Sequence, residues 1–186
     1  MIHWLPFILL ACVLLLVQTT VGGVLVFTVK GVGGVGPDLL AILATFAALW
    51  ARNWEEVMLA AWGMGFALDL TSSGGMEGGT ALGPMSLGYA AAAGLVFRIR
   101  EAFFRDKPLP QAFFAMIFCI LAHGVYLSLQ SLLAYHQTSW SQYGRRLLQA
   151  GLLAIYTGLL MVPGHWLLAK AQRWLVASPV GRAGRL

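Results

Sequence analysis

Apolar segments recur along almost the whole chain, and this feature most limits what the chain can fold into. Hydrophobic residues make up 59% of its 186 residues and charged residues only 10%, whereas about 25% of residues are charged in soluble domains. So few charged side chains cannot cover a water-facing surface. We therefore expect an all-α, polytopic membrane helical bundle over residues 1–170, followed by a basic cytoplasmic tail over residues 171–186.

The apolar segments predict about six transmembrane helices. The first exceeds the roughly 30 Å of a hydrocarbon core, so it must tilt or break near Gly22 and Gly23. The second and third are short, and we expect an antiparallel hairpin packed inside the bundle, joined by the polar turn 53–56. A five-span protein lacking one of these two is the alternative. The predicted segments cover residues 4–29, 37–51, 57–70, 82–98, 109–134 and 147–169.

The basic residues predict the orientation. With six spans and the N-terminus inside, nine of the twelve lysines and arginines fall on the cytoplasmic side, and only Lys30, Arg145 and Arg146 lie outside. The positive-inside rule then favours both termini in the cytoplasm. The basic residues form no stripe interleaved with aromatic residues, so we expect no nucleic-acid partner. The tail could also contact anionic membrane lipid.

Two aspartates stand at the outer end of the predicted hairpin. Asp38 follows Pro37 at a helix start, where a carboxylate caps free N–H groups. Asp69 ends the third segment, where the helix dipole disfavours a carboxylate unless a donor or cation compensates. It is interpreted either as a salt bridge or loop cap, with Lys30, Arg145 and Arg146 as candidate cations, or as a contact to a partner or ligand.

Glycines and a few polar residues complete the candidate set. The loop 71–83, which contains Gly79, could donate backbone N–H groups to a carboxylate or could simply be flexible. Gly65 and Gly88 stand where small residues permit close contact between membrane helices. Gln18, with Thr19 and Thr20, is expected to hydrogen-bond to a neighbouring helix rather than face lipid.

Enzyme motifs are missing from the sequence. The histidines are spaced singly, without the HExxH pattern of zinc enzymes, and neither a GxSG nucleophile sequence nor a phosphate-binding Walker loop is present. We therefore expect a non-enzymatic protein with no catalytic residue, metal or cofactor.

Several of these residues together resemble the bacterial rod shape-determining protein MreD family. They are Gln18 in the first span, PDLL at 37–40, GFALDL at 65–70, and Gly88–Tyr89 in the fourth span after a glycine-rich loop. The resemblance implies a six-helix bundle similar to the substrate-binding subunits of energy-coupling-factor transporters. It also implies a non-enzymatic subunit of the cell-elongation (rod) complex that binds MreC, in an assembly with MreB, RodA and a class-B penicillin-binding transpeptidase, and supports peptidoglycan synthesis and cell shape.

Two functions therefore remain open. As a scaffold, the chain would use its polar residues to fix the bundle or to meet a partner. As a small-solute binding or transport subunit, it would contain a buried polar pocket lined by residues such as Gln18, Trp62 and Tyr89. The candidate intramembrane or partner-contact residues are Gln18, Asp38, Gly65, Asp69, Gly79, Gly88 and Tyr89.

Overall fold

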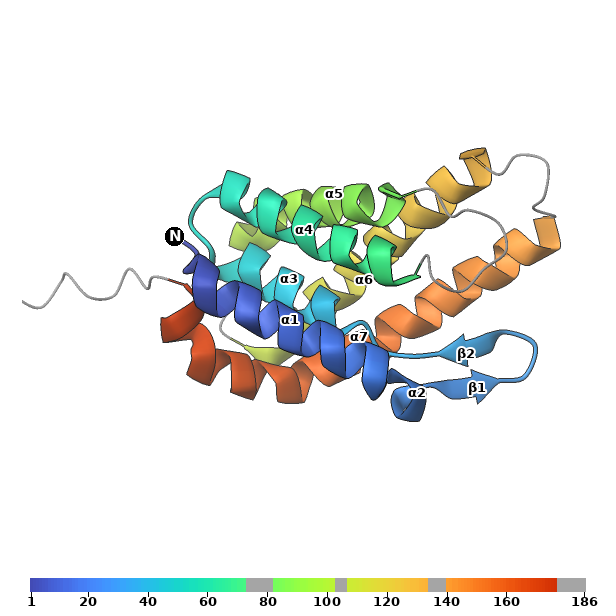
Figure 1. The fold of residues 1–186 in the computed structure, drawn as a ribbon, viewed down its shortest axis with the longest axis horizontal. Helices are drawn as coiled ribbons and strands as arrows, with labels where there is room; N and C mark the ends of the chain where they lie inside the picture. Colours follow the sequence, from blue (N-terminus) through green and yellow to red (C-terminus); the bar gives the residue numbers. More distant parts are fainter. Residues whose placement is uncertain (73–81, 103–106, 134–139, 177–186) are drawn as a thin grey trace, which may run out of the picture.

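A computed structural model describes residues 1–72, 82–102, 107–133 and 140–176 of the chain. These residues are predominantly helical, as predicted, and carry one small two-stranded antiparallel sheet (Figure 1). The elements in chain order are α1 (Trp4–Thr20), α2 (Gly22–Leu25), β1 (Phe27–Val29), β2 (Gly33–Val35), α3 (Leu39–Trp50), α4 (Trp54–Ser72), α5 (Pro84–Ile99), the 3-10 turn η1 (Arg100–Ala102), α6 (Pro108–Leu133) and α7 (Trp140–Leu175).

The first apolar segment breaks where its glycines predicted, but it does not resume as a long helix. Helix α1 ends at Thr20, the short α2 follows, and Phe27 to Val29 form strand β1. The strand pairs with β2 in the register Phe27 to Val35 and Val29 to Gly33. The turn between them uses Gly31 at φ 84° and Gly33 at φ 112°, which only glycine adopts without strain. The prediction of one helix over residues 4–29 is therefore wrong beyond residue 25.

Helix α3 lies at the centre of the bundle. Ten of its twelve residues, from Leu40 to Leu49, are buried, and it contacts α1, α4, α5, α6 and α7. No side chain in it is charged, so every face can pack against apolar neighbours. The terminal N–H and C=O groups of a buried helix need hydrogen-bond partners, which the protein itself can supply.

Helix α4 corrects the prediction that both short segments lie inside the bundle. It begins at Trp54, three residues before the predicted start, and its nineteen residues cover about 28 Å. A row of large side chains on one face is exposed: Leu59, Trp62, Phe66 and Leu70. Its main packing partner is α5. Of these two helices α3 is therefore the interior one, and α4 belongs to the outer layer of the described bundle.

Helices α6 and α7 are the two described helices long and apolar enough to cross a membrane. Helix α7 has 36 residues, or about 54 Å, and contains Pro163 in its interior. It continues through the tail boundary expected at residue 170 and ends at Leu175. In Figure 1 the first half of α7 extends beyond α1, α4 and α5, and the β1–β2 hairpin runs alongside it.

The N-terminus and the end of α7 meet at the opposite end of the bundle. The His3 N–H donates to the Leu175 carbonyl at 2.9 Å, and Ile2 pairs with Val176 as an isolated bridge. The Ile2 N–H also donates to the Glu56 carboxylate at 2.7 Å, in the first turn of α4. Three elements are thus joined at this end, where Figure 1 places the N-terminus.

Candidate functional site

Asp38 caps the buried N-terminal end of α3, as its position after Pro37 predicted. Its Oδ1 accepts the Ala41 N–H at 3.1 Å, and its own N–H donates to Thr157 Oγ1 on α7 at 3.0 Å. Gln18 on α1 accepts the Leu39 N–H at 3.0 Å through Oε1. The free donors of the first turn are therefore taken by side chains from other helices as well as by Asp38 itself.

The second carboxylate oxygen of Asp38 faces two further helices. It accepts a short hydrogen bond from the Tyr89 hydroxyl on α5, and His123 Nε2 on α6 lies 3.3 Å away. Tyr89 is fully buried and its ring packs edge-on against Phe118 at 5.0 Å between centroids. The group of Gln18, Asp38, Tyr89, His123 and Thr157, which we call the Asp38 cluster, thus joins the start of α3 to α1, α5, α6 and α7.

Asp69 is held differently, by the backbone of the next helix. Its carboxylate accepts N–H groups of Gly83 at 3.0 Å, Met85 at 3.3 Å and Ser86 at 3.1 Å. These are donors at the N-terminal end of α5, where the helix dipole favours a negative charge. The loop-cap interpretation is therefore confirmed. No ion pair joins Asp69 to Lys30, Arg145 or Arg146 in the described chain, although all three are part of it.

Gly65 and Gly88 bring the helices close enough for both acids to reach their partners. A Cβ on Gly65 would lie 2.6 Å from the Met85 carbonyl oxygen, so α4 and α5 touch there by their backbones. A Cβ on Gly88 would overlap the Ala122 carbonyl of α6, next to His123. The predicted close packing at these two glycines is confirmed. Gly79 lies outside the described residues.

Thr19 and Thr20 do not join helices as expected. Both are exposed, and their hydroxyls donate to carbonyls of their own helix: Thr19 to Leu15 and Leu16, and Thr20 to Leu16. A threonine satisfies its hydroxyl within the preceding turn at little cost, whereas the longer Gln18 reaches the adjacent helix.

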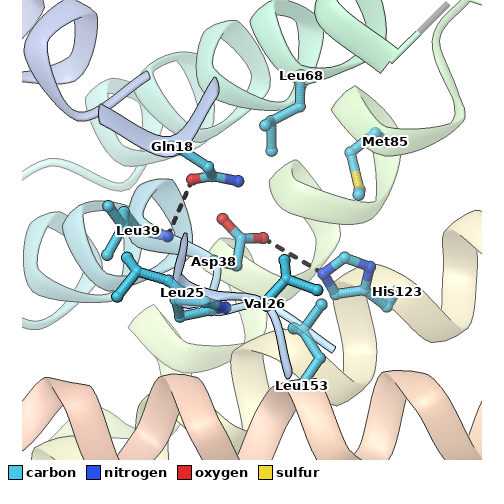
Figure 2. Close-up of a pocket in the computed structure, with 11 residues that line it drawn as sticks. Gln18, Leu25, Val26, Asp38, Leu39, Leu68, Met85, His123 and Leu153 are labelled. Carbon is cyan, nitrogen blue, oxygen red and sulfur yellow. Dashed lines mark hydrogen bonds and ion pairs between the residues drawn. The ribbon is translucent and has the colours of Figure 1, made fainter. Parts of the chain in front are cut away.

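A cavity of about 290 Å³ adjoins the Asp38 cluster. In Figure 2, Gln18 and His123 flank Asp38, and apolar side chains enclose most of the rest. Of the residues expected to line a pocket, Gln18 does, Tyr89 does not, and Trp62 lies on the outer face of α4 with 44% exposure. The lining residues are Gln18, Leu25, Val26, Gly36, Pro37, Asp38, Leu39, Leu68, Met85, His123 and Leu153.

His123 and Thr157 belong to the site but were not predicted. His123 is an ionisable residue inside an apolar segment, which is itself a signal of a functional or paired group. The single spacing of the histidines in the sequence was used only to argue against a metal site. Thr157 carries no comparable signal, because single threonines are common in membrane helices and its partner is a backbone group.

Arg100 is the positively charged counterpart of Asp38 and lies at the other, C-terminal end of α3. Its Nη1 donates to the carbonyls of Ala48 at 2.9 Å and Ala51 at 2.5 Å, and its guanidinium lies 3.8 Å from the centre of the Phe97 ring. An anion at the N-terminal end and a cation at the C-terminal end both match the dipole of α3. Charge therefore fixes both ends of the buried helix.

The described residues contain no group of three or more His, Cys, Asp or Glu side chains placed to hold a metal ion. What the Asp38 and Asp69 carboxylates do in the structure is accept hydrogen bonds from groups of the chain itself. Comparison with protein-family models, curated proteins and solved structures finds no match to this chain.

Proposed function

We propose that the chain is a non-enzymatic membrane subunit of the bacterial cell-elongation complex, similar to MreD, that binds MreC. In this proposal α1, α3, α4, α5, α6 and α7 are six spans arranged as in the substrate-binding subunits of energy-coupling-factor transporters. The proposal rests on the resemblance of residues 37–40, 65–70 and 88–89 to that family. It also assigns the chain to the inner membrane, beside RodA, MreB and the class-B transpeptidase.

The observation that carries the scaffold role is that the two buried carboxylates, Asp38 and Asp69, bind groups of the chain itself. Asp38 is 2% and Asp69 6% exposed, and each binds at least three groups of the chain. A buried carboxylate without partners costs about 1–3 kcal/mol or more, so the pairing of these two acids favours a rigid bundle. A rigid bundle with exposed apolar helix faces suits a protein that holds other membrane proteins in place.

The contact between the start of α1 and the end of α7 supports an even number of spans. His3 is hydrogen-bonded to Leu175, so α1 begins and α7 ends at the same end of the bundle. Arg52, Arg98 and Lys107 are exposed and follow or precede helix ends that lie on this side in the proposed topology. The positive-inside rule then assigns this end to the cytoplasm.

Two experiments test the proposal. Single cysteines at Arg52 and Lys30, in a variant with Cys12 and Cys119 replaced by alanine, should react with an impermeant thiol reagent from the cytoplasmic and the outer side respectively. Co-expression with tagged MreC from the same bacterium should co-purify the chain, whereas an unrelated single-span protein should not. Absence of co-purification, with the labelling pattern as predicted, would reject the MreC role and leave the topology standing.

The cavity beside Asp38 is the one observation that favours a small-solute subunit. Its volume of about 290 Å³ falls at the lower limit of ligand pockets, which span roughly 300–1,000 Å³. Its polar members Gln18 and Asp38 already bind groups of the chain. Mass spectrometry of the gently purified protein would favour this alternative if a small molecule remained bound at one equivalent and was lost in Gln18→Leu.

A further inference from the structure

A groove separates the turn of the β1–β2 hairpin from the first half of α7. Its volume is about 400 Å³, and Gly31, Val32, Gly144, Arg145 and Leu148 line it. Because two of these residues are glycines, part of the wall is bare backbone. The groove is distinct from the Asp38 cavity, with which it shares no lining residue.

The hairpin is fixed to α7 by specific contacts, so the groove has a defined shape. Gln149 Nε2 donates to the Gly34 carbonyl at 2.5 Å. Phe27 packs edge-on against Tyr156, with ring centres 5.4 Å apart. These contacts lie on the strands, and they leave the turn of the hairpin facing Gly144 and Arg145.

Positive charge gathers at this groove without a counter-ion among the described residues. Arg145 lines it, Arg146 is the next residue, and Lys30 adjoins Gly31 in the turn; all three side chains are exposed. None forms an ion pair within the described chain. The described acids at this end, Asp38 and Asp69, are buried and occupied by other donors. Among the described residues, the positive charge at the groove is therefore unbalanced, and such a charge attracts an anion.

In the membrane arrangement proposed above, the two arginines lie at the depth of lipid head groups. The apolar part of α7 runs from residue 147 to residue 169, about 34 Å of helix, which matches a hydrocarbon core of about 30 Å. Arg145 and Arg146 precede this stretch directly. They also lie on the side that the positive-inside rule leaves poor in basic residues, so orientation does not account for them.

We propose that this groove binds the phosphate group of an anionic phospholipid. Arg145 would hold the phosphate oxygens through its guanidinium fork, with Lys30 and Arg146 adding attraction. The absence of side chains at Gly31 and Gly144 leaves room for the head group. The inference rests on the membrane arrangement proposed above, but not on MreC, and the depth of the arginines is the same for either orientation of the chain.

Native mass spectrometry of the purified full-length chain tests whether lipid binding depends on the positive charge of the groove. We expect phosphatidylglycerol to remain bound in preference to phosphatidylcholine, and Arg145→Gln to weaken its binding about tenfold, as loss of a charge-assisted contact does. Arg52→Gln is the matched control, because it removes one exposed positive charge at the other end of the bundle. Competition by inorganic phosphate would identify free phosphate as sufficient, and its failure to compete would identify the lipid head group.

Gly144→Leu tests the groove itself without changing any charge. A Cβ at Gly144 meets nothing within 4 Å, so the helix accepts the side chain while the groove is filled. We expect an unchanged thermal midpoint and loss of phosphatidylglycerol binding. The proposal is overturned if both lipids are retained equally, or if both variants bind as the unmodified chain does. Co-purification with MreC is a separate measurement, so failure here leaves the proposed function intact.

Discussion

Asp38 and Asp69 stand at the same end of the bundle but are stabilised in different ways. Asp38 binds side chains from other helices, among them Tyr89 and His123, in addition to the N–H of Ala41. Among the described residues, the partners of Asp69 are all backbone N–H groups at the start of α5. Asp38 therefore links helices far apart in the sequence, whereas Asp69 joins the end of α4 to the start of the next helix, α5.

The difference shows that the stabilisation of a buried carboxylate can depend on the identity of neighbouring residues or on backbone geometry alone. Asp38 loses a partner when Tyr89 or His123 is replaced, so its site depends on several residue types at once. The partners of Asp69 exist in any sequence that starts a helix there, provided that α4 and α5 approach closely. Gly65, one turn before Asp69, permits that approach.

Asp38→Ala should have the largest effect. It removes the N-cap of α3 and leaves the Tyr89 hydroxyl, His123 and the Ala41 N–H without their shared acceptor. We expect a loss of about 3 kcal/mol or more, measured as a lower thermal midpoint in detergent. Asp38→Asn retains a good N-cap and should recover part of the loss. An unchanged midpoint in Asp38→Ala would contradict the linking role.

Gly65→Ala should disrupt the Asp69 site without altering Asp69. Its Cβ would press on the Met85 carbonyl at 2.6 Å and force α4 from α5, at a cost of about 1–3 kcal/mol. Gly63→Ala is the matched control on the same helix, because a Cβ there meets nothing within 4 Å, and it should be neutral or slightly stabilising. Equal thermal midpoints for the two variants would show that close backbone contact is not needed.

Asp69→Ala should destabilise less than Asp38→Ala. It frees three backbone donors at the start of α5, and loss of such a cap costs about 0.5–2 kcal/mol. The effect should be local, so hydrogen exchange should increase at residues 83–86 and remain unchanged at the start of α3. Increased exchange at both places would mean that the two acids act as one unit.

Tyr89→Phe should have the smallest effect. The ring and its contact with Phe118 remain, and only the hydroxyl donated to Asp38 is lost. Asp38 keeps Ala41 and His123, so we expect a loss of about 1 kcal/mol. A shift in thermal midpoint as large as that of Asp38→Ala would assign the stability of the site to this single bond.

The sequence by itself determined the helical class, the approximate positions of the apolar helices and the capping role of Asp38. These follow from local properties: hydrophobic runs, a proline at a helix start and an acid beside it. The glycine spacing also predicted close helix contacts at Gly65 and Gly88, because only a missing Cβ allows backbones to touch.

Only the tertiary structure decided which short helix is enclosed and which residues meet Asp38. Helices α3 and α4 are both apolar, and their burial depends on neighbours contributed by the rest of the chain. His123 and Thr157 lie 85 and 119 residues from Asp38 in sequence. Such contacts depend on helix rotation and depth, which no local pattern encodes. Strand β1 likewise stands at residues 27–29 where a helix was predicted, because the hairpin that it forms packs on α7.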